Sequence, residues 1–339
     1  MEEEKILNRL KEKVAKSLSR VFSIFIVDKS KRAVKRNEYR QKINKFLNVQ
    51  GPEKTAYGDR YIYHMQEGSD LVLKMLQKGT PCFLSRFVVV EMSAVYHFIT
   101  SKKSIIQYSD DIREKMANNA GFFPATDESI SRFSSEMIDA LKEVDIMACW
   151  YKDGEEMICD RHCPDAKLVG LEVTNPLLFS EPWTQYLQGK KVLVIHPFAE
   201  TIEQQYKHHK ELFENPKMLP KFELKTLKAV QSAADNQDLL EYQTWFEALE
   251  DMCRQIDQID FDIALIGAGA YGIFLGAHCK KLGKQAVHMG GNTQILFGIT
   301  GRRFEEADYY NIKLNKYWTR PSEMEKPKGA EKIEGGCYW

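Results

Sequence analysis

The chain has 339 residues, with 48 basic and 48 acidic side chains and a net charge of zero. This balance excludes the strong basic field that nucleic-acid-binding proteins usually carry, so no nucleic-acid partner is expected. The length allows one large or two modest domains, and a hydrophobic content of 43% is typical of a globular protein.

The first residues and the cysteines indicate the compartment. The chain begins with the acidic sequence MEEE, and no apolar segment with a cleavage site follows, so no secretory signal is expected. The longest apolar runs, such as 21–27, are too short to span a bilayer. Seven cysteines, an odd number, favour reduced thiols, and the isolated pair Cys159 and Cys163 favours ordinary thiols over a zinc site. We therefore expect a cytoplasmic protein.

Residues 1–58 are predicted to form a helical, basic N-terminal extension. Apolar side chains recur at helical spacing from Ile6 to Phe25, and the stretch from Lys29 to Lys45 is strongly basic. Two interpretations of the basic stretch stay open. It contacts a partner or anionic lipid at the inner face of a membrane, or it is a solvated helix face or linker.

Residues 59–300 alternate between helical and strand patterns. The predicted helices are 59–76, one that opens after Arg86, 127–141 with Asp127 to Ser129 as its cap, 201–213 and 239–256. The predicted strands are 82–85, 146–151, 191–195, one within 222–230, 263–266 and 285–288. The alternation predicts an α/β fold with a Rossmann-like, mostly parallel sheet and helices on both faces. Residues 301–339 are predicted to form an extended C-terminal tail, with its last two aromatic residues either docked or free.

The most specific pattern lies between residues 261 and 298. The strand 263–266 is followed by Gly267, Gly269 and Gly272 in the spacing G-x-G-x-x-G, then by a helix that ends at Gly283. Glycines let a ligand approach the backbone, and free N–H groups at a helix start bind phosphate oxygens. The pattern predicts a phosphate or nucleotide site. The alternative is that the glycines serve only tight packing of the helix on the strand.

The end of the next strand argues against a dinucleotide-dependent enzyme. Such proteins carry an acidic residue there, about 20 residues after the glycines, which binds the ribose hydroxyls. Here that place holds His288, Met289, Gly290 and Gly291. We therefore expect no NAD and a second glycine turn that a ligand can approach closely. A nucleotide-dependent enzyme of other chemistry, such as a reductase, stays open as a third alternative, although a reductase would need the missing acidic residue.

Sites in parallel α/β sheets lie at the carboxyl ends of strands. Residues with suitable chemistry follow four predicted strands, and we expect them to converge on one cleft. The candidate ligand contacts are Ser85, Arg86, Asn119, Gly121, Gly267, Gly269, Tyr271, Gly272, Gly290, Gly291 and Gln294. The candidate catalytic residues are Glu91, His196 and His288.

Several candidates also have a structural interpretation that stays open. Arg86 and Glu91 suit a structural ion pair, and Glu91 suits the first turn of a helix, where a carboxylate stabilises the dipole. His196 and His288 suit hydrogen-bonded structural positions, and Tyr271 suits core packing.

Segments from four parts of the chain carry a family resemblance. The segment 84–91, LSRFVVVE, resembles the R-F-G-D-G-E segment of GT-D fold bacterial glycosyltransferases. ALIGAGAYG and LGKQAVHMGG resemble the C-terminal strand, turn, helix and strand of that family. NNAGFFP and VLVIHPFAETI are similar to linking motifs of a capsule-associated branch. The resemblance covers roughly residues 71–298 and implies transfer of a hexose from a UDP-sugar to an acceptor.

The resemblance implies roles for single residues and one departure. Arg86 and Glu91 match the family's Arg and Glu, whereas the Asp of its D-x-E falls on Val89. Mg²⁺ and Mn²⁺ prefer carboxylate oxygens, and Val89 supplies none, so Glu91 is left as the single candidate metal ligand. Three alternatives stay open: the metal is held elsewhere, the reaction is metal-independent, or transferase activity is lost.

The preferred hypothesis is a glycosyltransferase of surface polysaccharide or glycoconjugate assembly. Its expected partners are a UDP-sugar donor and a saccharide or glycoprotein acceptor. We expect Glu91, His196 or His288 to handle the acceptor proton. The alternative is a non-catalytic nucleotide-binding or scaffold protein of a polysaccharide locus.

Overall fold

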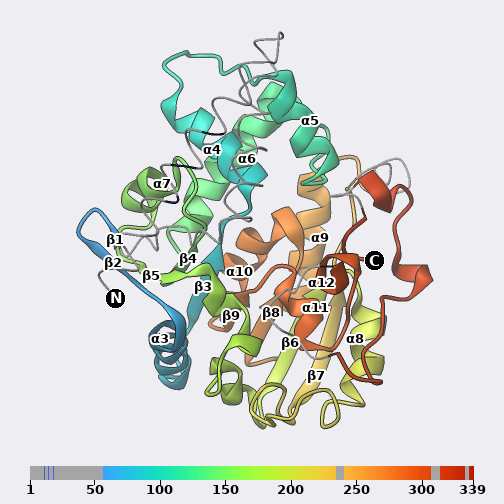
Figure 1. Cartoon of the computed structure of the whole chain (residues 1–339). Helices are drawn as coiled ribbons and strands as arrows, with labels where there is room; N and C mark the ends of the chain where they lie inside the picture. Colours follow the sequence, from blue (N-terminus) through green and yellow to red (C-terminus); the bar gives the residue numbers. More distant parts are fainter. Residues whose placement is uncertain are drawn as a thin grey trace. The chain divides into compact units, whose positions relative to one another are not determined.

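The computed structural model describes residues 56–233, 240–306, 314–332 and 336–339, together with the helical positions Lys11, Val14 and Leu18. The chain divides into two compact units, Met1–Lys54 and Thr55–Trp339. The predicted N-terminal extension of residues 1–58, with its basic stretch, lies almost entirely outside the described residues. The second unit contains the sheet and the helices that cover it (Figure 1).

The second unit is built on a nine-stranded sheet in the order β1-β2-β5-β4-β3-β9-β8-β6-β7. Strand β1 runs antiparallel to β2, and every other described pair of neighbours is parallel. This confirms the predicted α/β class with a mostly parallel sheet. The strands are β1 (Ala56–Tyr57), β2 (Arg60–Tyr63), β3 (Cys82–Arg86), β4 (Ile146–Cys149), β5 (Lys167–Gly170), β6 (Lys191–His196), β7 (Glu223–Lys228), β8 (Ile263–Ile266) and β9 (Gln285–His288).

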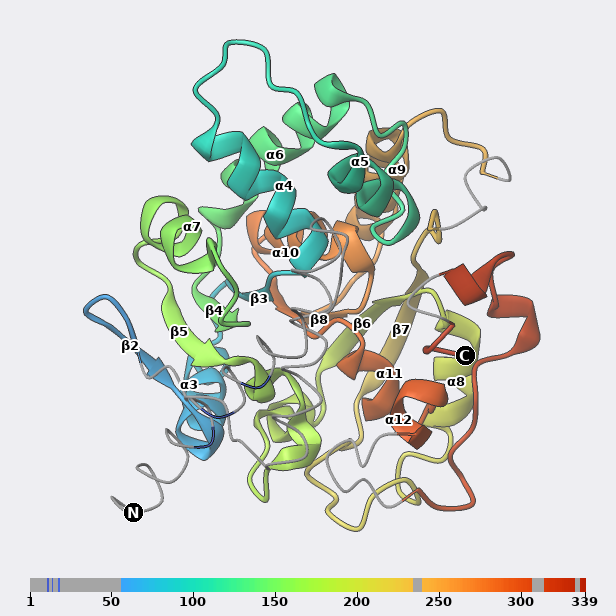
Figure 2. The ribbon, with the colours of Figure 1, turned by 45° about the horizontal axis from the view of Figure 1, so that its top comes forward.

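Helices cover both faces of the sheet, as predicted (Figure 2). One apolar core joins the sheet to α4 (Val89–Thr100), α6 (Asp127–Leu141), α9 (Trp245–Asp257) and α10 (Gly272–Lys281). A second core joins the other face to α3 (Met65–Gln77), α8 (Ala199–Tyr206) and α11 (Asn292–Leu296). The other α-helices within the described part of Thr55–Trp339 are α5 (Asp110–Asn118), α7 (Glu155–His162) and α12 (Arg302–Glu306).

Strand β6 shows why the central strands are apolar without interruption. Val192 and Val194 point into the core that contains α8, whereas Leu193 and Ile195 point into the core that contains α10. Because successive side chains of a strand alternate between faces, a sheet covered on both faces needs apolar residues at every position.

Several predicted boundaries are wrong. The predicted helix 59–76 begins with strand β2, because Ile62 is buried and pairs with Leu168 of β5. The predicted helix 201–213 corresponds to α8, which ends at Tyr206 and is followed by turns. The predicted helix 239–256 corresponds to α9, which starts at Trp245, after Thr244 caps it by accepting from the N–H of Glu247 at 3.2 Å.

The cap of α6 also differs from the prediction. Thr126, not Asp127, is the N-cap residue, and its hydroxyl accepts from the N–H of Ser129 at 3.2 Å. The Ser129 hydroxyl accepts from the N–H of Thr126 in return, at 3.0 Å, which completes a capping box. Strands β1, β2 and β5 and helices α5, α7, α11 and α12 were not predicted, and α12 lies within the segment 301–339 that was predicted to be extended. None of the helices in the described ranges has the length and apolar character that crossing a bilayer requires.

Candidate functional site

The four strand ends predicted to converge are neighbours in the sheet. Strands β3, β9, β8 and β6 stand side by side, and Ile266 pairs with both His288 and Ile195. The residues that end or follow these strands therefore lie along one edge. They are Arg86, His288, Gly267 and His196.

Strands β6 and β8 also form a topological switch point. The chain leaves β6 through α8 toward β7, and it leaves β8 through α10 toward β9, on the opposite face. Ligands of open α/β sheets bind in the crevice that forms where such connections diverge. The glycine pattern lies at this point.

Two glycines of the pattern are required by packing. A Cβ atom on Gly267 would lie 2.5 Å from Cδ2 of His196, and one on Gly272 would lie 2.2 Å from Nε2 of His288. Any larger residue at either position would displace a buried imidazole. The packing interpretation therefore holds for these two positions.

The middle glycine differs from the other two. Gly269 is exposed, has φ +53°, and a Cβ atom there would meet nothing within 4 Å. It opens a short 3₁₀ turn, Gly269–Tyr271, that leads into α10. In the described part of the chain no hydrogen bond uses the N–H groups of Ala268, Gly269 or Ala270. Free N–H groups at a helix start, next to an open surface, suit an anion.

The second glycine turn contacts the first. A Cβ atom on Gly267 would lie 2.8 Å from the carbonyl oxygen of Gly290, which has φ +59°. A Cβ atom on Gly290 would in turn lie 2.9 Å from Nη1 of Arg86. The Arg86 guanidinium also lies 4.6 Å from the ring centre of Trp150, directly after β4. The predicted positive charge is thus next to the second turn, which itself contacts the first.

Trp150 was not among the predicted site residues. The pattern 146–151 placed it inside a strand, but β4 ends at Cys149, so Trp150 belongs to the carboxyl edge. An aromatic residue near the end of a predicted strand was the signal that could have identified it.

The two predicted histidines lie at this edge but are buried. Burial lowers the pKa of His196 to about 3. Burial, followed by the charge of Arg86, lowers the pKa of His288 to about 3. The N–H of Phe198 donates to Nδ1 of His196 at 3.0 Å, so the proton of this neutral ring is on Nε2. Both side chains are therefore neutral at neutral pH, and their packing favours the structural interpretation.

Glu91 and Val89 lie in the first turn of α4. Glu91 is 2% exposed and Val89 is 37% exposed, so the two side chains point in different directions. A D-x-E pair needs both carboxylates on one ion. No group of three His, Cys, Asp or Glu side chains in the described ranges could hold a metal. The residues present therefore do not fit the divalent ion of the resembled family.

Three other predicted contacts, Ser85, Asn119 and Gly121, have different surroundings. The Ser85 hydroxyl is fully buried and makes no hydrogen bond to the described residues. Asn119 is exposed at the end of α5, and Gly121, with φ +66°, packs on Ser232. The Ser232 hydroxyl lies 3.2 Å from that of Tyr271. The loop with Asn119 and Gly121 thus contacts Ser232, and Ser232 in turn contacts Tyr271 at the end of the first glycine turn.

Tyr271 and Gln294 use their side chains within the fold. The Tyr271 ring is stacked on Trp245 at 4.5 Å between ring centres and is 2% exposed. These contacts favour the alternative that Tyr271 packs in the core. The Gln294 amide lies 3.4 to 3.5 Å from the carbonyl oxygens of Ile299, Thr300 and Tyr338. These contacts show that the Gln294 side chain holds the C-terminal segment.

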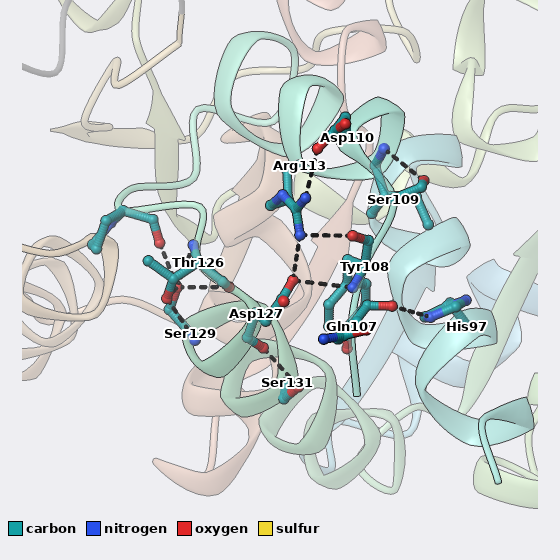
Figure 3. A network of polar contacts seen from close by, with 12 residues as sticks. His97, Gln107, Tyr108, Ser109, Asp110, Arg113, Thr126, Asp127, Ser129 and Ser131 are labelled. Carbon is teal, nitrogen blue, oxygen red and sulfur yellow. Dashed lines mark hydrogen bonds and ion pairs between the residues drawn. The ribbon is translucent and has the colours of Figure 1, made fainter. Parts of the chain in front are cut away.

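A polar network fixes the segment that carries Asn119 and Gly121 (Figure 3). Arg113 donates to the carboxylate of Asp127 at 2.7 Å and to the carbonyl of Tyr108 at 2.6 Å. The N–H of Tyr108 donates to Asp127 at 3.0 Å, and this bond, together with Arg113, lowers the pKa of Asp127. His97 bonds the carbonyl of Gln107 at 2.9 Å. The carboxylate of Asp127 therefore joins α6 to α5 and to the residue Tyr108 before it, and His97 joins α4 to the same segment.

All seven cysteines are free thiols in the structure. Cys159 and Cys163 are both buried in and after α7. Burial also raises the pKa of Cys149 and Cys279, as expected for thiols that pack as small apolar groups.

Comparisons with known proteins give few matches. No protein-family model matches the chain, and no curated protein matches it. Two solved structures are similar, each at 13% identity over 79% of this chain and 90% of theirs. One is described as a selenomethionine-substituted structure of domain of unknown function 1792, with a TM-score of 0.42. The other is described as the same domain with a distinct glycosyltransferase fold, with a TM-score of 0.40. At these scores and this identity the likeness establishes nothing about the activity of this chain.

Proposed function

We propose that the chain is a glycosyltransferase that uses a nucleotide sugar, with a UDP-hexose as the expected donor. The observation that carries the proposal is the turn after β8. It presents three backbone N–H groups without a described partner, beside the open Gly269, at the switch point of the sheet. The motif resemblance of residues 84–91 and 261–298 supports the choice of donor class.

The donor diphosphate would lie between the first turn and Arg86. Its oxygens would accept from the N–H groups at residues 268–270, and the positive end of α10 favours the same charge. Arg86, held beside Gly290, would contribute a planar cation. Hydrogen bonds to charged groups contribute about 1.5–3 kcal/mol each, so these contacts would supply a large part of the binding free energy.

The same groups would assist departure of the nucleoside diphosphate. Negative charge grows on the leaving phosphate in the transition state, and fixed N–H dipoles and a guanidinium stabilise it without reorganisation. We assign the acceptor proton to Glu91 rather than to a histidine. A histidine with a pKa of about 3 is too weak a base for a hydroxyl at neutral pH. No step is assigned to a metal ion, because the donor set does not fit one.

The alternative function is a non-catalytic nucleotide-binding or scaffold protein. One observation favours it: the residue at the Asp position of D-x-E is the exposed Val89, so the carboxylate pair is missing. Surface polysaccharide assembly, the saccharide or glycoprotein acceptor and contact with a membrane face belong to the proposal as its expected setting.

Calorimetry with UDP, UDP-hexoses, CMP-sugars and NAD, each with Mn²⁺ and with chelator, tests the proposal. We expect UDP and a UDP-hexose to bind and NAD not to bind. Slow hydrolysis of the bound UDP-hexose to UDP and free hexose, with water as the acceptor, would support transferase activity over the scaffold alternative. Absence of binding for every nucleotide, with and without metal, would contradict both.

A further inference from the structure

The side chain of Tyr338 lies on the second glycine turn. A Cβ atom on Gly291 would be 3.2 Å from Cε1 of the Tyr338 ring. A Cβ atom on the preceding Gly290 would be 2.9 Å from Nη1 of Arg86. The turn after β9 is therefore flanked by an aromatic ring and a guanidinium group, which come from distant parts of the chain.

Several contacts hold the Tyr338 ring in this place. Arg303 donates to the Tyr338 hydroxyl at 3.1 Å, and its guanidinium lies 5.7 Å from the ring centre. The N–H of Arg303 donates to the carbonyl of Cys337 at 2.9 Å. The next residue, Trp339, packs edge-on against Phe198 at 5.8 Å. Both views place the end of the chain beside α12, which carries Arg303 (Figures 1 and 2).

The place that Tyr338 covers corresponds to the ribose site of nucleotide-binding units. In a strand–turn–helix–strand unit the phosphates lie on the first turn, and the nucleoside extends to the end of the second strand. Here β8, the Gly269 turn, α10 and β9 form the unit, and the two turns contact each other through Gly267 and Gly290. The acidic residue that usually binds ribose at the second strand end is replaced by Gly290 and Gly291. Tyr338 covers the place where that residue would act.

We propose that Tyr338 contacts the nucleoside of a nucleoside diphosphate bound at the glycine turn. The inference rests on the proposed function and adds a residue that selects for a base. Aromatic stacking on a base corresponds to about tenfold or more in affinity. A ligand without a base gains nothing from this contact, so UDP and inorganic pyrophosphate separate the nucleoside site from the phosphate site.

The test is calorimetric titration of four proteins with UDP and with pyrophosphate. The proteins are wild type, Tyr338→Ala, Tyr338→Phe and the control Tyr186→Ala. Tyr186 is half-buried, and Lys190 lies 4.8 Å from its ring centre at the amino end of β6. We expect Tyr338→Ala to weaken UDP about tenfold and to leave pyrophosphate unchanged. Tyr338→Phe should retain UDP affinity within about threefold, and Tyr186→Ala should change neither ligand.

Other outcomes have distinct meanings. Equal loss of both ligands in Tyr338→Ala, or no change in either, would give Tyr338 only a structural role and overturn the inference. Higher affinity of Tyr338→Ala for both ligands would show that the C-terminal segment obstructs the site, and this would also overturn the inference. If wild type binds pyrophosphate but not UDP, the inference about Tyr338 is overturned, whereas phosphate binding at the first glycine turn is retained. If wild type binds neither pyrophosphate nor UDP, the proposed function is overturned. If Tyr338→Ala does not fold, Tyr338→Leu removes the stacking face while keeping an apolar side chain, and the same expectations apply.

Discussion

The carboxylate of Glu325 accepts a hydrogen bond from the backbone N–H of Glu200 at 2.8 Å. It also accepts from the N–H and the hydroxyl of Thr201, so a residue of the C-terminal segment caps the N-terminus of α8. Because α8 follows β6, one of the two helix starts at the switch point is occupied by the protein's own carboxylate. This leaves the turn before α10 as the helix start with N–H groups available to an external anion.

We predict that Glu325→Ala lowers the free energy of unfolding by about 1–3 kcal/mol, because it removes the acceptor of buried N–H groups and a favourable charge at a helix start. Urea unfolding measures the change. Glu323→Ala is the matched control, since Glu323 belongs to the same segment but is exposed. Equal changes in the two variants would mean that the cap contributes nothing measurable.

Gly269→Ala is predicted to weaken UDP and pyrophosphate at least about tenfold, because the added methyl group meets the ligand while the positive φ strains the turn. Gly189→Ala is the control. Gly189 has φ +73° and open space around its Cα, but it lies before the amino end of β6. Each substitution should cost about 1–2 kcal/mol of stability for the left-handed conformation. Equal ligand affinity in the two variants would make Gly269 purely structural.

The fold was predictable where local pattern decides it. The unit from β8 to β9 follows from an apolar run, a glycine turn, a helix stopped by Gly283 and a second apolar run, each within a few residues. Strand β2 was not predictable in this way. Its four residues favour a strand by their side chains, but they stand directly before the helical pattern of α3. The buried pairing of Ile62 with Leu168 depends on a segment far along the chain.

The candidate site was predictable only in part for the same reason. The rule of carboxyl strand ends selected Arg86, His196, Gly267 and His288, and the order β3-β9-β8-β6 makes their strands neighbours. Sequence could not show that His288 is buried under Gly272, because only the packing of α10 on β9 decides this. Sequence also could not show that Tyr338 lies on the second glycine turn, beside Gln294, because Gln294 and Tyr338 are 44 residues apart in the chain.

The two buried histidines predict loss of stability in acid. Their pKa values are about 3 in the folded protein, against about 6.5 in an unfolded chain. The unfolded state therefore binds more protons below pH 6.5, and the stability present above that pH is lost as the pH falls toward 3. Each histidine contributes about 1.4 kcal/mol per pH unit within this window. Between pH 7.5 and 5.5 we expect the two together to lower the free energy of unfolding by about 2–3 kcal/mol.

Urea unfolding of wild type and His288→Gln at both pH values measures this contribution. The variant should lose about half of the pH-dependent change, whereas His208→Gln, at an exposed position, should lose none. Burial raises the pKa of Glu155, which changes stability in the opposite direction, so the comparison is between the slopes of variant and wild type. An unchanged slope in His288→Gln would show that this histidine is charged in the folded protein or absent from the linkage.

The last prediction concerns the metal. Val89 occupies the Asp position of the family motif, is 37% exposed, and starts α4, whereas Glu91 is buried two residues later. With one carboxylate, Mg²⁺ or Mn²⁺ would keep more of its waters and bind weakly. We therefore expect UDP affinity in wild type to differ little between Mn²⁺ and chelator. Because residue 89 faces outward and away from Glu91, Val89→Asp supplies one hydrated carboxylate, so we expect it to introduce at most a modest metal dependence of UDP affinity.

The control separates a metal ligand from a mere helix charge. Ser93→Asp adds the same charge on the same exposed side of α4, one turn farther from its start, where the Ser93 hydroxyl now donates to the carbonyl of Val89 at 2.8 Å. Val89→Asp also stabilises the helix by about 0.3–1 kcal/mol through its dipole, an effect that does not require a metal. Metal dependence in Val89→Asp but not in Ser93→Asp would therefore show that position 89 reaches the phosphates. Strong metal dependence in wild type would instead mean that carboxylates outside the resembled motif hold the ion. Asp127 would be a poor choice for that role, because Arg113 and the N–H of Tyr108 already occupy it.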